Sequence, residues 1–168
     1  MHGSQLLASE RPRIKLEGAR PVGYRTICIA GVRDPYFAEQ LNDIVEAARE
    51  DVQAELERVR IAFHAYGRDA VMGAMEPRRQ HGGHEIGLLL EVLGETQEDA
   101  DAACGMLRST LLHYGYSGRV STAGNLALPF SPSDIACGKV YEFSIYHLMD
   151  VDAAQSLFTV KPQEASTP

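Results

Sequence analysis

The chain has 168 residues, of which 45% are hydrophobic and 23% charged, and its formal charge is −7. This acidic balance argues against nucleic acid or an anionic membrane surface as the main partner, because both attract basic proteins. No apolar run approaches the ~20 residues of a membrane helix, and the first residues lack the apolar core of a signal peptide. We therefore expect a cytoplasmic protein without a membrane partner. The length fits one folded domain, which we place at 23–160, after an N-terminal arm (1–22) and before a disordered tail (161–168).

Hydrophobic periodicity predicts six elements between the arm and the tail. Residues 24–32 alternate between two faces, as a strand does. Asp34 then supplies a helix N-cap and Pro35 a first helical residue, and apolar residues follow at helical spacing as far as Leu56. Residues 59–66 alternate again and predict a second strand.

The second half of the chain holds the other three predicted elements. A third strand is expected over 86–92. Thr96 with Asp99 resembles a capping box that opens a second helix, and Gly115 stands near the end of that helix as a stop signal. Residues 139–149 alternate as a fourth strand, and a short helical turn at 152–158 is expected to close the domain.

The order β-α-β-β-α-β predicts a ferredoxin-like sandwich, in which an antiparallel four-stranded sheet carries two helices on one face. The residues expected to face the helices are Ile27, Ile29, Phe63, Leu88, Leu90, Phe143 and Ile145. The opposite face would present Thr26, Cys28, His64, Tyr66, Leu89, Glu91, Ser144 and Tyr146. A face of such mixed polarity is usually covered by a loop, a partner or a ligand.

The stretch HAYGRDAVMGAMEP follows the second predicted strand and is rich in groups that carry chemistry. We take His64 and Asp69 as candidate catalytic residues, since an imidazole and a carboxylate can transfer protons. Tyr66 and Arg68 are candidate substrate-binding residues, with Arg68 suited to a carboxylate or phosphate. The alternative is turn chemistry at the strand end, with Asp69 pairing with Arg68 or capping a local turn.

The stretch STAGNLALPFSPSDIACG, at 121–138, is an apolar segment of unusual length between the second helix and the fourth strand. Long loops without secondary structure are uncommon unless they bind something. We expect an interface or substrate-lining loop whose polar contacts come from Asn125, Ser131, Ser133 and Asp134; plain packing against the domain is the alternative. It holds no G-x-S-x-G elbow that would signal a hydrolase nucleophile.

Other candidate sites are weaker. His81 and His84 with Glu85 lack the H-E-x-x-H spacing, so we predict a basic loop rather than a metal site there. No glycine-rich nucleotide-binding fingerprint occurs. The residues do not indicate which cofactor the protein uses. The cysteines, which number three and show no CxxC spacing, are interpreted as small apolar residues: Cys28, Cys104 and Cys137.

Five segments together resemble the C-terminal portion of the acyclic terpene utilisation AtuA-like family, over about 21–158. They are GYRTICIAGVRDP (Gly23–Pro35), AYGRDAVMGAMEP (Ala65–Pro77), HEIGLLLEV (His84–Val92), RVSTAGNLALPFSPSDI (Arg119–Ile135) and VYEFSIYHLMDVD (Val140–Asp152). In that family a larger N-terminal region precedes such a segment, so the resemblance implies a separate small subunit that pairs with a larger AtuA-like chain. It also implies breakdown of branched or terpenoid acids as coenzyme A thioesters, and it assigns no catalytic residue.

Two functional hypotheses follow. The first is a small subunit of a heteromeric catabolic enzyme that acts on a carboxylic acid or acyl-CoA and contributes loops to an intersubunit site. The second is an ACT-like module that binds a small molecule or supports assembly, without catalysis of its own. An RNA-recognition domain of the same topology is excluded by the acidic balance and by the lack of paired aromatic residues on the central strands.

Overall fold

The computed structural model describes residues 3–5, 7, 10–78, 83–120, 125–152 and 157–158. The chain divides into two compact units, Met1–Arg20 with Glu142–Pro168 and Pro21–Tyr141, and each is treated by itself below. The elements, in chain order, are β1 (Arg13–Val32), α1 (Pro35–Glu39), α2 (Leu41–Glu55), β2 (Val59–Tyr66), η1 (Gly73–Met75), β3 (Ile86–Gly94), α3 (Gln97–His113) and β4 (Asp134–Asp150).

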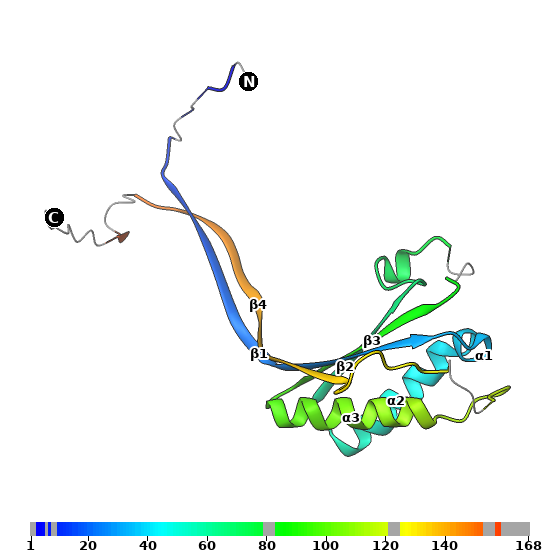
Figure 1. Cartoon of the computed structure of the whole chain (residues 1–168). Coiled ribbons are helices and arrows are strands. Elements are labelled where there is room, and N and C mark those ends of the chain that lie inside the picture. Colours follow the sequence, from blue (N-terminus) through cyan, green and yellow to red (C-terminus); the bar gives the residue numbers. More distant parts are fainter. Residues whose placement is uncertain are drawn as a thin grey trace, which may run out of the picture. The chain divides into compact units, whose positions relative to one another are not determined.

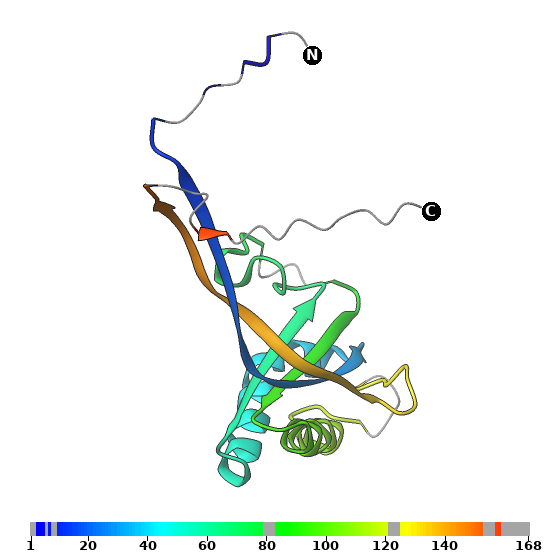
Figure 2. The ribbon, with the colours of Figure 1, turned by 90° about the vertical axis from the view of Figure 1, so that its left-hand side faces the viewer.

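The strands form one open antiparallel sheet in the order β2-β3-β1-β4, so the chain belongs to the α+β class (Figure 1). β3 pairs antiparallel with both β1 and β2, and the register places Phe63, Leu90 and Cys28 side by side. The two long helices, α2 and α3, cover one face of this sheet (Figures 1 and 2). β2 and β4 are therefore the two edges.

The two faces of β1 are the reverse of those predicted: the residues expected on the open face lie beneath the helices. Thr26, Cys28, Ala30 and Val32 are at most 1% exposed beneath the helices, whereas the alternate residues of β1, beginning with Ile27, lie on the open face. Both faces of this strand are apolar, so hydrophobicity alone did not distinguish them. The small residues are the ones beneath the helices, because the close packing of a core selects by volume as well as by polarity.

The predictions for the other strands have mixed outcomes. Leu88 and Leu90 are fully buried against the helices, as expected. Phe143 and Ile145, which were expected there too, are 77% and 51% exposed. Both belong to the compact unit Met1–Arg20 with Glu142–Pro168. β4 begins at Asp134, and only its residues up to Tyr141 belong to the unit that contains the helices.

Side-chain caps fix the helix ends. The Asp34 carboxylate accepts hydrogen bonds from the backbone N–H groups of Tyr36 and Phe37, and the Thr96 hydroxyl accepts one from Asp99 N at 3.1 Å. Both caps were predicted, but the first helix is interrupted at Gln40, which separates α1 from α2. Arg119 donates to the carbonyls of residues 112–114 and so satisfies the C-terminal end of α3.

β1 and β4 are both longer than their sequence patterns indicated. Residues 13–22, expected in the N-terminal arm, belong to β1, and β4 extends over 134–150. Of the helical turn expected at 152–158, residues 153–156 lie outside the described part of the chain, as does the expected tail 161–168.

Candidate functional site

A pocket of about 450 Å³ opens beside the edge strand β2, between α2 and the segment that follows β2. This volume lies within the usual range for small-molecule sites, which combine an apolar lining with a few polar groups. The apolar lining includes Leu41, Val45, Phe63, Ala70, Ala74 and Leu88. The polar lining consists of Asn42, Glu46, Arg49, His64 and Asp69. The two predicted catalytic residues, His64 and Asp69, are both among the lining residues, although the imidazole of His64 lies on the open face of the sheet, on the side away from α2.

Arg49 of α2 is the cationic group of this pocket. Its guanidinium lies 5.3 Å from the ring centroid of Phe63, and its Nη1 is 2.6 Å from Oε2 of Glu46. Its Nε is buried and has no hydrogen-bond acceptor among the described residues. A planar guanidinium held against an aromatic ring is well placed to receive a carboxylate, and Glu46 occupies only the Nη1 side of it.

His64 is held by a charged cluster on the open face of the sheet. Its Nε2 is 2.8 Å from Oε2 of Glu91, and Oε1 of Glu91 is 2.7 Å from Nε of Arg25. The contact between Nε2 and Oε2 is a hydrogen bond when Nε2 carries a proton, because a carboxylate oxygen accepts.

The segment after β2 turns sharply and separates the predicted residues. The N–H groups of Arg68, Asp69 and residue 70 all donate to the carbonyl of Ala65. Gly67 permits the turn, since its φ is +92° and a Cβ there would lie 2.7 Å from the carbonyl oxygen of Glu85. Arg68 points to α1, where it donates to the carbonyl of residue 38 at 3.4 Å. Tyr66 is 54% exposed, and neither it nor Arg68 lines the pocket.

The second set of predicted residues lies at the other edge of the sheet. Asn125 is buried, Ser131 is exposed, and the Ser133 hydroxyl donates to Asp134 at 3.3 Å. Asp134 in turn accepts two hydrogen bonds from Arg108 of α3, at 2.8 and 3.1 Å. Three strand spacings, about 14 Å, separate this edge from β2, so one chain does not bring the two sets together.

The long segment that precedes β4 is more regular than predicted. Ala127 pairs with Gly31 through two backbone hydrogen bonds of 2.7 and 2.8 Å, next to the end of β1. Residues 134–138, expected in the loop, are the start of β4. Leu126 is buried and Phe130 is 52% exposed, so part of the segment packs on the domain and part faces solvent. Residues 121–124 lie outside the described part.

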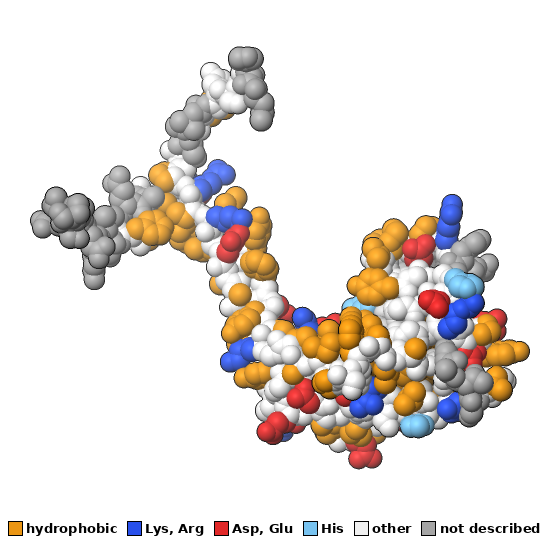
Figure 3. Space-filling model, viewed as in Figure 1, with side chains coloured by type: hydrophobic (Ala, Val, Ile, Leu, Met, Phe, Trp, Pro, Cys, Tyr) orange, Lys and Arg blue, Asp and Glu red, His pale blue; other side chains and the backbone are white. Residues whose placement is uncertain are grey.

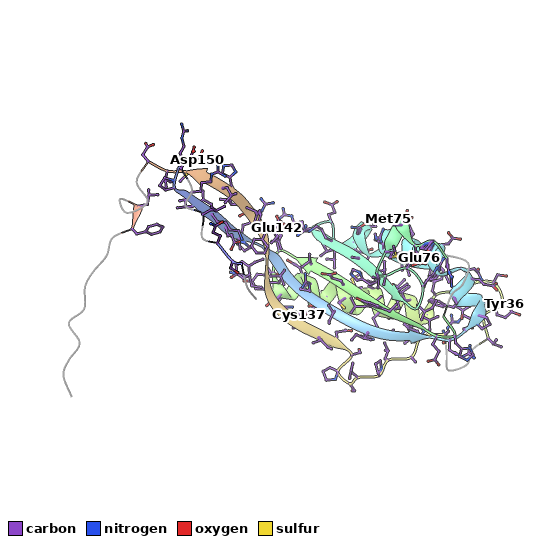
Figure 4. All side chains as sticks on the ribbon, turned by 90° about the horizontal axis from the view of Figure 1, so that it is seen from above. Tyr36, Met75, Glu76, Cys137, Glu142 and Asp150 are labelled. Atoms are coloured by element: carbon purple, nitrogen blue, oxygen red, sulfur yellow. The ribbon has the colours of Figure 1, made fainter. Side chains whose placement is uncertain are left out.

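Two of the cysteines behave as the small apolar residues that were predicted. Burial, followed by the nearby Asp134 carboxylate, raises the pKa of Cys28 to about 11 and that of Cys104 to about 12. Both are therefore protonated near neutral pH and unreactive. Cys137 differs, because it is exposed on β4 (Figure 4). Among the described residues, no group of three or more His, Cys, Asp or Glu is arranged to hold a metal ion.

The sequence did not single out Arg49 or Arg25. Arg49 reads as one of several charges on the solvent face of an amphipathic helix, and its contact with Phe63 depends on how α2 lies against β2. Arg25 and Glu91 could have been paired from the strand register, because Glu91 stands opposite Ile27 and Arg25 is its diagonal neighbour. That register was not known from the sequence.

Comparisons with protein-family models, curated proteins and solved structures found no match to this chain. None of the helices in the described ranges is both long enough and apolar enough to span a membrane. The geometry above therefore carries the functional argument.

Proposed function

We propose that this chain is the small subunit of a heteromeric, cytoplasmic catabolic enzyme that acts on a carboxylic acid or acyl-CoA, and that its partner is a larger AtuA-like chain. The observation that carries the proposal is the pocket beside β2, where Arg49, His64 and Asp69 surround an apolar lining. This combination suits a ligand with a short hydrocarbon body and an acidic or thioester head. The sequence resemblance supports the same substrate class.

Each group in the pocket has a role in this proposal. The apolar lining receives the acyl chain, Arg49 binds the carboxylate or thioester oxygen, and His64, whose imidazole a substrate would reach around the edge of β2, is the proposed acid–base group. Glu46 is bound to Nη1 of Arg49 in the free protein, so it competes with the substrate for the charge of the guanidinium. Asp69 contributes a second acid–base group on the same rim.

Two features support an intersubunit site. The segment containing Asn125, Ser133 and Asp134 lies at the opposite edge of the sheet from the pocket. It can therefore contribute side chains to a site on a partner chain, but not to the pocket of the same chain. The open face also carries aliphatic residues of β1 and β3 beside the Arg25–Glu91–His64 cluster. The strand order β2-β3-β1-β4 with both long helices on one face supports the finer assignment of a ferredoxin-like sandwich, a fold whose second sheet face is free to contact another chain.

The pocket can be tested by turnover of isovaleryl-coenzyme A in the complex purified through this chain. Arg49→Gln should lower kcat/KM by about 10- to 100-fold, since it removes a charged hydrogen bond to the substrate. Glu46→Gln should raise the affinity a few-fold, by about 0.3–1 kcal/mol, because it removes the competing carboxylate. Arg58→Gln serves as the control, since Arg58 is an exposed arginine paired with Glu95 outside the pocket. An Arg49→Gln complex as active as the Arg58→Gln complex would rule out this role of the pocket.

One observation favours the alternative of an ACT-like binding or assembly module. The Arg25–Glu91–His64 cluster joins three neighbouring strands. A histidine held in this way can stabilise the surface of the sheet without taking part in a reaction. In that case His64→Gln would leave the turnover of the complex intact and weaken only its assembly. A selective loss of kcat in that variant favours the enzyme subunit.

A further inference from the structure

The paired strand segments 13–20 and 142–150 form a two-stranded antiparallel ribbon, referred to below as the ribbon (Figures 1 and 2). Val151 N donates to the carbonyl of Pro12 at 3.0 Å, Arg13 pairs with Asp150, and a Cβ on Gly18 would touch Ile145. These contacts fix a single register, in which Arg13 stands opposite Asp150 and Gly18 opposite Ile145. Glu142 and Asp150 mark the two ends of the β4 segment in Figure 4.

This register makes the ribbon amphipathic, because alternate residues of a strand point to opposite faces. One face, called here the apolar face, carries Ile14, Leu16, Phe143, Ile145 and Met149, with His147 among them and Arg20 at one end. The other face carries Arg13, Lys15, Glu17 and Asp150, together with the exposed Tyr146 and Leu148. Phe143 is 77% exposed, and Figure 3 shows hydrophobic side chains along the surface of the ribbon.

An apolar face of this kind needs a cover. An isolated two-stranded ribbon is at best marginally stable in water, and it gains stability when a hydrophobic face packs on something. Within the described part of this unit, no helix lies against the apolar face. The question is therefore which molecule covers it.

The charges of the ribbon point to a second copy of the chain. The chain as a whole carries −7, which opposes self-association through most of its surface. On the ribbon, by contrast, basic and acidic side chains balance, and they pair within the ribbon: Arg13 with Asp150, Lys15 with Glu17, and Arg20 with Glu142. This internal pairing leaves little charge to select a partner of opposite sign. The arginine on the apolar face, Arg20, lies at its end and is paired with Glu142.

The available area is also sufficient for a dimer. At roughly 200 Å² for a full aromatic or aliphatic side chain, Phe143 and Ile145 expose about 250 Å² per copy. The partly exposed Ile14, Leu16 and Met149 add roughly 100 Å². Two copies would bury about 700 Å² of apolar surface, which corresponds to a total interface of about 1,100 Å² when some 65% of it is apolar. This passes the ~1,000 Å² expected of a specific interface.

We propose that two copies of this chain associate around a twofold axis by packing the apolar faces of their ribbons together, with Ile145 in the middle part of the contact and Phe143 toward one end. The contact is isologous, since each copy offers the same surface. The proposal does not rest on the pocket or its substrate. If a larger subunit binds as well, the ribbon contact places two copies in each assembly.

The test is sedimentation equilibrium of the full chain, purified alone, with two matched variants. Phe143→Ser removes an aromatic side chain from the apolar face, and Tyr146→Ser removes one of similar exposure, 74%, from the opposite face. The wild type should dimerise with a dissociation constant on the order of micromolar. Phe143→Ser should raise this constant at least about ten-fold, and Tyr146→Ser should leave it nearly unchanged.

Several outcomes would overturn the proposal. The wild type would be monomeric at about 100 µM, well above the expected constant, or Tyr146→Ser would weaken the dimer as much as Phe143→Ser. A third contradicting outcome is a complex that contains one copy of this chain and loses its larger subunit in the Phe143→Ser variant. The larger subunit, and not a second copy, would then cover the apolar face. Circular dichroism of both variants checks that each keeps the wild-type secondary structure, so that a loss of dimer reports on the contact.

Discussion

Raising the pH from 8 to 10 should lower the free energy of unfolding by about 2.5 kcal/mol through the two buried thiols alone. Cys28 and Cys104 are fully buried between the sheet and α3. Burial, and secondly the Asp134 carboxylate, raises their pKa values from 9.0 to about 11 and about 12. In the unfolded chain both thiols regain an ordinary pKa and ionise first.

The sign follows from the direction of these shifts. A group whose pKa is higher in the folded state stabilises the fold fully at a pH below its unfolded pKa. That stabilisation is lost as the pH rises through the folded pKa. At pH 10 each thiol is about nine-tenths ionised in the unfolded chain but mostly protonated in the fold, which costs about 1.3 kcal/mol per thiol.

Urea unfolding at the two pH values, followed by circular dichroism, measures this loss. In Cys104→Ala the free energy of unfolding should fall by about half as much between pH 8 and pH 10 as the two thiols predict. Any loss of stability that the substitution causes equally at both pH values does not affect this difference. Cys137→Ser, which alters the exposed cysteine, should behave as the wild type. If Cys104→Ala loses as much stability between pH 8 and pH 10 as the wild type does, the burial argument is refuted.

Three further changes test the local structure. Asp34→Ala removes a helix cap that also accepts a hydrogen bond from Tyr116 at 2.8 Å, and should cost about 1–2 kcal/mol in urea unfolding. Gly67→Ala places a Cβ 2.7 Å from the carbonyl of Glu85 at positive φ and should cost about 1–3 kcal/mol; a thermal midpoint equal to that of the wild type would contradict the turn geometry. Arg119→Ala frees the last carbonyls of α3, so amide hydrogen exchange should become faster in its final turn and remain unchanged in β3.

The order and type of the elements were predictable because each has a strong local signal. The Asp34-Pro35 and Thr96–Asp99 caps and the alternation of β2 and β3 depend on neighbouring residues only. The phase of β1 was not predictable in this way, since Ile27 and Cys28 are both apolar and the choice depends on the volume available under α3. The extent of β1 was missed although Arg13–Glu17 alternate between charged and apolar residues, because Pro12 and Pro21 flank this run and its pairing partner in β4 is distant in sequence.

The candidate site was predictable in part for the same reason. His64 and Asp69 were found because polar groups at a strand end are visible in the sequence, and the fold places both at one pocket. Arg49 comes from another element and required the packing of α2 on β2. Asp134 was expected to contact substrate, but its carboxylate is paired with Arg108 at the other edge of the sheet, and that pairing depends on strand order.

The most direct measurement for the central claim compares isovaleryl-coenzyme A turnover by the isolated chain with turnover by the complex purified through it, after native mass spectrometry of that complex. We expect a larger chain to be present in fixed stoichiometry, activity in the complex, and none in the isolated subunit. Activity should fall in Arg49→Gln while the larger chain is retained. Full turnover by the isolated 18.4 kDa chain would contradict the account.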